Sequence, residues 1–110
     1  MGAFIKGDIV VVPFPFSDLT NHKKRPALVL ATMTGDDVIL CQITSKSVAD
    51  AYALPLSDAD LAQGALQQES NIRPNRLFTA DSRIIVRRVG VLAPPTLHDA
   101  LERVIRLLTA

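Results

Sequence analysis

Residues 25–45 read RPALVLATMTGDDVILCQITS, and the rest of the fold can be built outward from this stretch. Two apolar runs rich in β-branched residues, 26–32 and 38–44, flank the turn-forming residues Thr34, Gly35 and Asp36. Short apolar runs bounded by turn residues are typical of buried strands. The stretch therefore predicts a β-hairpin.

This hairpin brings an arginine to a hydroxyl group. With a two-residue turn that includes Gly35, paired residue numbers add up to 69, so Arg25 lies opposite Thr44 with Cβ atoms roughly 5 Å apart. A longer loop would move Arg25 towards Ser45 or Lys46. A guanidinium is always charged and fits a phosphate in two-point contact, while a hydroxyl beside it can donate to a phosphoryl oxygen. This end of the hairpin is a candidate phosphate-binding corner.

Further short strands are expected on both sides of the hairpin. Residues 7–12 form a β-branched run, and Pro13 and Pro15 after it cannot donate to a sheet ladder. That strand should therefore run into a sheet edge or a loop. The other expected strands cover residues 52–56, 76–80 and 83–92.

Two helices complete the expected fold. Residues 57–64 resemble a short helix with Ser57 as N-cap and Gly64 as its stop. Residues 96–108 follow two prolines, open with a weak capping box of Thr96 and Asp99, and repeat apolar side chains at helical spacing. We therefore predict one domain over residues 1–110, mainly β, as a partly open β-barrel with a short mid-chain helix and a C-terminal amphipathic helix.

Composition narrows the functional classes. Of the 110 residues, 48% are hydrophobic and 21% charged, which is ordinary for a globular chain. The net charge of +1 means that any affinity for nucleic acid has to come from a local patch. The single Cys41 allows no intrachain disulfide and fits a reducing cytoplasm, and no apolar run approaches the roughly 20 residues that span a bilayer.

Motifs for metals, cofactors and nucleophilic catalysis are missing from the sequence. The two histidines are far apart, and no Cys–His cluster, Ser-His-Asp pattern or glycine-rich phosphate loop occurs. We therefore expect no cofactor and no bound metal.

The polar segments also have ordinary structural explanations. The basic run before the hairpin, residues 22–25, could be a solvated turn, and residues 70–76 could be a polar loop between strands. Arg83, Arg87 and Arg88 belong to an expected strand whose alternation suggests outward cations that form a solvated face. His22 is a conceivable acid or base, although a lone loop histidine is usually a surface residue.

Four motifs together resemble the MazF/PemK family of toxin-antitoxin endoribonucleases. They are Gly7-Asp8-Ile9-Val10 with the Pro13–Phe16 segment, Arg25–Leu30, Ile43-Thr44-Ser45, and residues 70–79 followed by Gly90. The resemblance covers nearly the whole chain. It implies an SH3-like, partly open barrel with a C-terminal helix, usually a homodimer.

The resemblance also implies an activity. The active-site arginine of the family falls on Arg25 and its active-site hydroxyl on Thr44, which are the two residues that the hairpin count brings together. The family cleaves single-stranded RNA without a metal, by attack of the ribose 2′-hydroxyl on the adjacent phosphate. Arg25 would supply positive charge and Thr44 would position the phosphate. A cognate antitoxin peptide, acidic and apolar, would be the partner. The residues expected to contact RNA are Lys23, Lys24, Ser45, Arg73, Asn75 and Arg76.

One position departs from the family pattern. Some members carry an acidic residue where this chain has Asn75, and an amide cannot accept the 2′ proton. His22 and Asp81 are the other candidates for that role. Two further readings stay open at this point: a CcdB-like gyrase-poisoning toxin, and a catalytically decayed SH3-like binding module.

Overall fold

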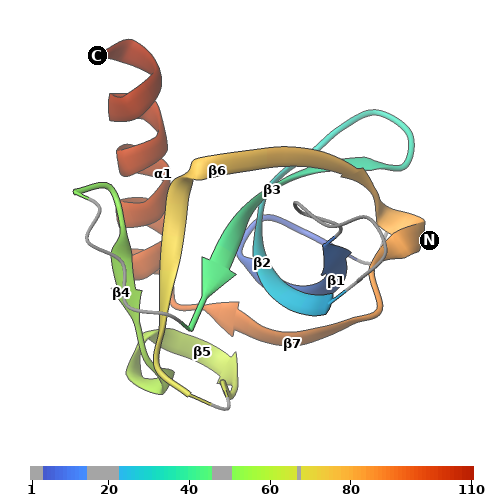
Figure 1. Ribbon diagram of the computed structural model, residues 1–110, viewed down its shortest axis with the longest axis horizontal. Coiled ribbons are helices and arrows are strands. Elements are labelled where there is room, and N and C mark those ends of the chain that lie inside the picture. The colour runs from blue at the N-terminus through green and yellow to red at the C-terminus, as the bar shows by residue number, and fades with distance from the viewer. Residues whose placement is uncertain (1–3, 15–22, 46–50, 67) are drawn as a thin grey trace.

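The computed structural model describes residues 4–14, 23–45, 51–66 and 68–110. The chain is mainly β, with one long helix at its C-terminal end (Figure 1). The strands are β1 (Asp8–Phe14), β2 (Lys23–Thr32), β3 (Asp37–Thr44), β4 (Leu54–Leu56), β5 (Leu61–Gly64), β6 (Ser70–Asp81) and β7 (Arg87–Leu92). The helices are η1 (Asp58–Asp60), η2 (Ser82–Ile84) and α1 (Pro94–Thr109).

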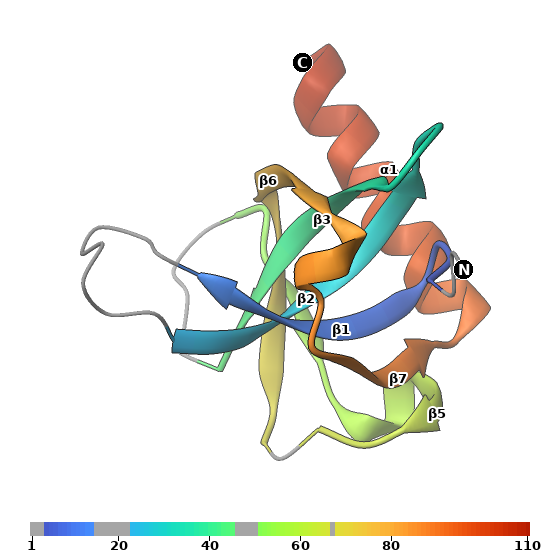
Figure 2. The same ribbon diagram turned by 90° about the vertical axis from the view of Figure 1, so that its right-hand side faces the viewer.

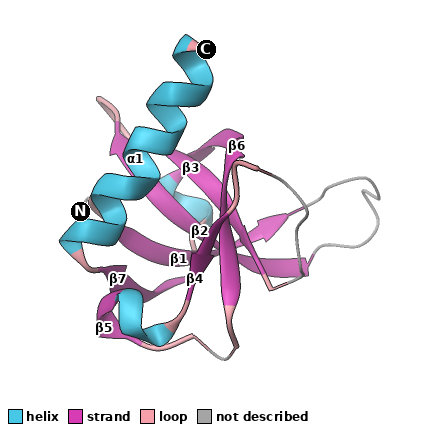
Figure 3. Ribbon diagram, turned by 90° about the vertical axis from the view of Figure 1, so that its left-hand side faces the viewer, coloured by secondary structure: helices cyan, strands magenta, loops and turns pink. Residues whose placement is uncertain are grey.

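The strands form one curled antiparallel sheet in the order β4-β6-β3-β2-β1-β7-β5. Its two edge strands, β4 and β5, are joined by residues 57–60 alone, so the sheet has to curl until its edges approach each other (Figure 3). This arrangement confirms the predicted partly open barrel.

The expected helix over residues 57–64 is wrong beyond its first turn. Ser57 and Asp60 do form a capping box, but the helical part is the single 3₁₀ turn η1. From Leu61 the chain continues as β5 and pairs with β7, with Gly64 opposite Gly90. Pairing with an exposed strand edge therefore overrides the local helix signal.

Helix α1 begins two residues earlier than expected, at Pro94. Proline suits the first turn of a helix because the N–H that it lacks would have no partner there. The proposed capping box does not form: Ala93 is the N-cap, Thr96 Oγ1 lies 3.5 Å from Asp60 Oδ1, and Asp99 pairs with Arg103.

The sheet buries side chains on both of its faces. The helix face carries Ile9, Leu28, Cys41 and Ile43 and packs against Ala100 and Val104 of α1 together with other apolar residues. The opposite side, called the distal face here, carries Val10, Val12, Ala27, Val29 and Leu40. Because successive side chains of a strand alternate between faces, this division fixes where each neighbouring polar side chain points.

The hairpin of β2 and β3 has the register predicted from sequence, but for a different reason. The loop is longer than two residues, since Met33 N–H donates to Asp37 O at 2.9 Å, and the first pairs, such as Thr32 with Val38, add up to 70. A bulge between Val29 and Ala31 then shifts the pairing by one residue. From there the pairs, ending with Ala27↔Gln42, add up to 69 (Figure 2 shows β1, β2 and β3 side by side).

The Gly7-Asp8 motif anchors the start of β1. Gly7 has a φ of +98°, which glycine adopts readily, and its N–H donates to Val29 O at 2.9 Å. Asp8 is 1% exposed; its carboxylate accepts from Ile5 N–H at 2.9 Å and lies 3.4 Å from Arg88 Nη1. The sequence suggested that Arg88 would lie on a solvated face. In the structure it also forms an ion pair with the buried carboxylate of Asp8.

Cys41 is buried on the helix face. Burial raises the pKa of its thiol to about 12, partly offset by a hydrogen bond with the Leu28 backbone. The thiol therefore stays neutral near pH 7 and behaves as a small apolar side chain.

Candidate active site

Arg25 and Thr44 lie at the same end of the distal face. Arg25 pairs with Val12 of β1, whose side chain belongs to the distal core, and Thr44 pairs with Asn71 of β6. Extending the register of β2 and β3 by two residues beyond its last pair places Arg25 opposite Thr44. The three polar side chains then form a row across β2, β3 and β6, with neighbouring strands about 4.8 Å apart.

The electrostatics of this row favour an anion. Arg25 is half-buried, its Nε–H has no hydrogen-bond partner among the described residues, and no described carboxylate forms an ion pair with it. Thr44 is 6% exposed, so its hydroxyl is held at the end of a packed strand. A guanidinium that has no counter-ion among the described residues and lies beside a fixed hydroxyl can bind a phosphate.

A second polar row lies one step further into the sheet. Gln42 of β3 pairs with Arg73 of β6, and both residues point to the distal face because Cys41, Ile43 and Ile72 occupy the helix face. Gln42 is 8% exposed, and its Oε1 has no hydrogen-bond partner within the described part of the chain.

Sequence reasoning missed Gln42. Its only signal was a lone polar residue inside an apolar run, two positions before Thr44 and therefore on the same face. A buried acceptor without a partner is costly in a folded protein, and a bound ligand or an ordered water can satisfy it.

Residues 70–76 are part of β6, not a loop. The ladder with β3 runs from Asn71 to Arg73 and resumes at Leu77, which leaves residues 74–76 without partners on β3. Pro74, which has no N–H to donate, is buried at this bulge, and Asn75 and Arg76 are exposed. The bulge therefore presents two of the expected RNA-contacting residues to solvent beside the polar rows.

The remaining expected residues are more scattered. Lys24 is exposed and alternates onto the other face from Arg25, and Lys23 pairs with Phe14 at the end of β2, where its side chain is not described. Ser45 is exposed directly after Thr44. His22 lies outside the described residues.

Asp81 is unsuited to the role of proton acceptor. It pairs with Asp37 at the far end of β3, seven residues from Thr44, or roughly 23 Å along the strand. Its carboxylate binds Arg83 at 2.6 Å, and hydrogen bonds from Arg83 lower the pKa of Asp81 to about 2. So low a pKa makes the carboxylate a weak base.

Within residues 4–14, 23–45, 51–66 and 68–110, no three His, Cys, Asp or Glu side chains are grouped so that they could hold a metal ion. No helix in these ranges is long and apolar enough to cross a bilayer.

The same fold occurs in several solved structures. A mycobacterial endoribonuclease in complex with its cognate antitoxin superposes with a TM-score of 0.77 at 12% identity, over 97% of this chain and 96% of that one. Deinococcus radiodurans MazF, in a MazE–MazF crystal, gives 0.75 at 17% identity over 96% of both chains. The Mycobacterium tuberculosis toxin MazF-mt6 gives 0.68 at 24% identity over 89% and 91%. At these identities the likeness shows the fold.

The sequence itself establishes the family. No curated protein gives a significant match. The family model described as "PemK-like, MazF-like toxin of type II toxin-antitoxin system" matches residues 5–108, nearly the whole chain. This match lends no support to the gyrase-poisoning or decayed-module readings. The chain belongs to the PemK-like, MazF-like family of type II toxin–antitoxin toxins.

Proposed function

We propose that this toxin is an endoribonuclease that cleaves single-stranded RNA without a metal, with Arg25 and Thr44 as catalytic residues. The observation that carries the proposal is the row of Arg25, Thr44 and Asn71 at one end of the distal face, in which the guanidinium has no described counter-ion. Single strands suit such a row because their phosphates and bases are accessible from one side.

Arg25 and Thr44 each assist one part of the RNA cleavage reaction. The ribose 2′-oxygen attacks phosphorus and loses its proton, the bond from phosphorus to the 5′-oxygen breaks, and that oxygen gains a proton. Negative charge builds up on the non-bridging oxygens, and Arg25 stabilises it. The Thr44 hydroxyl donates to one of these oxygens and fixes the phosphate. DNA is not a substrate because it lacks the attacking hydroxyl.

Purified protein should cut a long unstructured RNA, with a chelator present or absent, and should leave the same DNA sequence intact. An intact RNA under both conditions would contradict the proposal. Cleavage that stops when the chelator is added would contradict the metal-independent mechanism.

Gln42 is expected to assist by accepting a hydrogen bond from the substrate. Gln42→Leu keeps the side-chain size but removes the acceptor, so cleavage should slow by up to about tenfold, the worth of one hydrogen bond. Single-turnover kinetics measure this change. Gln63→Leu, the same substitution at an exposed position of β5, is the matched control. Equal rates for both variants would remove Gln42 from the site.

We also propose that the toxin is a homodimer neutralised by an acidic antitoxin peptide. The solved relatives include toxins crystallised with their antitoxins, and a basic set here (Lys23, Lys24, Arg25, Arg73 and Arg76) would attract such a peptide. Light scattering should give twice the 11.9 kDa chain mass, and Lys23→Glu with Lys24→Glu should weaken antitoxin binding. A monomer mass at micromolar concentration would contradict the homodimer. Antitoxin affinity that is unchanged by this double charge reversal and by added salt would contradict the proposed acidic peptide contact.

A further inference from the structure

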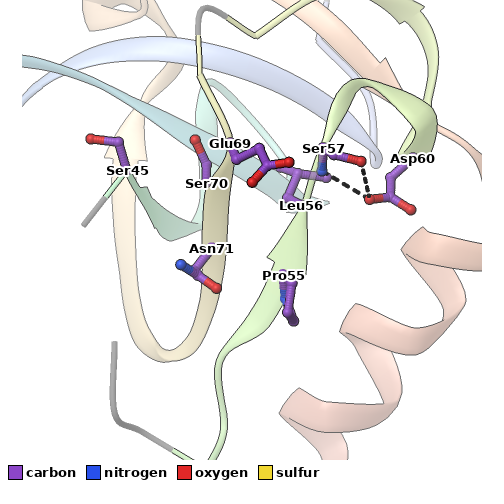
Figure 4. A pocket seen from close by; sticks show the side chains of 8 residues that line it. All are labelled: Ser45, Pro55, Leu56, Ser57, Asp60, Glu69, Ser70 and Asn71. Carbon is purple, nitrogen blue, oxygen red and sulfur yellow. Dashed lines mark hydrogen bonds between the residues drawn. The ribbon is translucent and has the colours of Figure 1, made fainter. Parts of the chain in front are cut away.

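A pocket of about 440 Å³ opens beside the end of β3. Its lining includes Ser45, Pro55, Ser57, Asp60, Glu69 and Asn71 (Figure 4). Ser45 directly follows Thr44, and Asn71 is the ladder partner of Thr44, so the pocket borders the polar row that carries the proposed chemistry.

The two carboxylates of the pocket differ in what they can do. Asp60 is used by the fold, because its Oδ2 accepts from Ser57 N–H at 2.9 Å and from Ser57 Oγ at 3.4 Å (dashed in Figure 4). Glu69 is exposed, and no described residue forms a hydrogen bond or ion pair with its side chain. Of the two carboxylates, Glu69 is therefore the one that is free to accept from a ligand.

The lining disfavours a phosphate and suits a nucleobase. The carboxylates of Asp60 and Glu69 repel an anion. Arg25, at the other end of the row that it forms with Thr44 and Asn71, attracts one. A bound RNA strand would therefore turn its phosphate towards Arg25 and Thr44 and a neighbouring base towards the pocket. There Pro55, exposed on β4, offers an apolar surface to the base, and Glu69 accepts hydrogen bonds from N–H groups on its edge.

We propose that this pocket binds the base next to the cleaved phosphodiester and that Glu69 selects bases with an exocyclic amino group. Guanine binds most tightly, because its N1–H and N2–H groups can donate in parallel to one carboxylate. Uracil binds most weakly, because its exocyclic groups are acceptors that face a carboxylate. The inference rests on the proposed function for its biological meaning, but the pocket can be tested separately.

Nucleotide binding tests the pocket without any catalysis. Isotope-labelled protein is titrated with GMP, AMP, CMP and UMP, and the backbone amide signals of Ser57, Ser70 and Asn71 are followed by NMR. GMP should bind at least about fivefold more tightly than UMP, the lower limit for a two-point base contact. Glu69→Gln should remove that preference, whereas Glu102→Gln on the exposed surface of α1 should keep it. Equal affinity for the four nucleotides, or an unchanged preference in Glu69→Gln, overturns the inference.

RNA cleavage then shows whether the pocket acts on the substrate. Cut ends from a random-sequence RNA pool are sequenced for the native protein and for Glu69→Gln. One position beside the cut should be enriched in amino-bearing bases with the native protein and lose that enrichment in the variant. An identical base preference overturns the inference and leaves the endoribonuclease proposal standing. If RNA stays intact while GMP still binds selectively, the proposed function fails and the base pocket stands.

Discussion

Arg25→Ala should slow RNA cleavage by a factor of about 10² to 10³, the usual cost of removing one preorganised donor from developing negative charge. Arg25 has no described carboxylate partner, so its charge is available to the phosphate in the transition state. Arg25→Lys should also be strongly impaired, because an ammonium cannot make the two-point contact of a guanidinium. Single-turnover cleavage of a labelled RNA measures both effects.

Two comparisons separate this chemical effect from a loss of folding. Arg106→Ala removes an exposed arginine from α1 and should leave both the rate and the melting temperature unchanged. Arg25→Ala should melt close to the native protein, since the Arg25 Nε–H has no hydrogen-bond partner to lose within the described chain. In bacteria, expression of the native chain should arrest growth and Arg25→Ala should not. Full activity or equal toxicity of Arg25→Ala would remove Arg25 from the mechanism.

The approach of Arg25 to Thr44 could be predicted because strand pairing is simple arithmetic once the turn is placed. The turn itself was placed too tightly, and the bulge near Leu30 compensated for the longer loop. A single sequence gives no sign of that bulge, because Val29, Leu30 and Ala31 suit a regular strand equally well. Neither the longer loop nor the bulge was predicted. The predicted register was nevertheless correct, because the two features shift the strand pairing in opposite directions.

The polar residues of β6 were harder to predict. Asn71 and Arg73 lie in a segment whose composition and Pro74 suggest a loop, yet they pair with Thr44 and Gln42. Tertiary pairing overrides composition here, since β3 offers an edge with which β6 can form a ladder. The bulge at residues 74–76 accommodates the proline without breaking the strand. The sequence indicated Arg73 as a candidate RNA contact, but it did not place Arg73 and Asn71 on a strand paired with β3.

In residues 57–64, too, tertiary strand pairing overrides the local sequence signal. Its first turn was predicted correctly, with Ser57 as the N-cap, and the structure adds a capping box of Ser57 and Asp60. A helix that continued to Gly64 would have left the edge of β7 without a partner. Instead the chain pairs with β7, and Gly64 serves that pairing rather than ending a helix.

Gly64→Ala is therefore expected to be among the most destabilising single substitutions. Gly64 has a φ of +85°, which costs an L-residue about 1–2 kcal/mol. An added Cβ would also clash with the carbonyl oxygen of Val89 and come within 2.5 Å of Gly90 Cα. Both atoms belong to the backbone of β7, so the strain cannot be relieved by a side-chain rotation. We expect a total loss of about 3–4 kcal/mol in the free energy of unfolding, or roughly 15 °C in melting temperature.

Gly35→Ala separates the two contributions. Gly35 has a similar φ of +90°, but a Cβ there would meet nothing within 4 Å, so only the backbone cost of about 1–2 kcal/mol remains. Urea unfolding of the three proteins measures the difference, which should be about 2 kcal/mol between the two variants. Equal destabilisation would mean that β5 moves away from β7 to admit the methyl group. In that case the curled sheet would not depend on close contact at this edge, and the barrel would have to be held together mainly by the packing of α1 on the helix face.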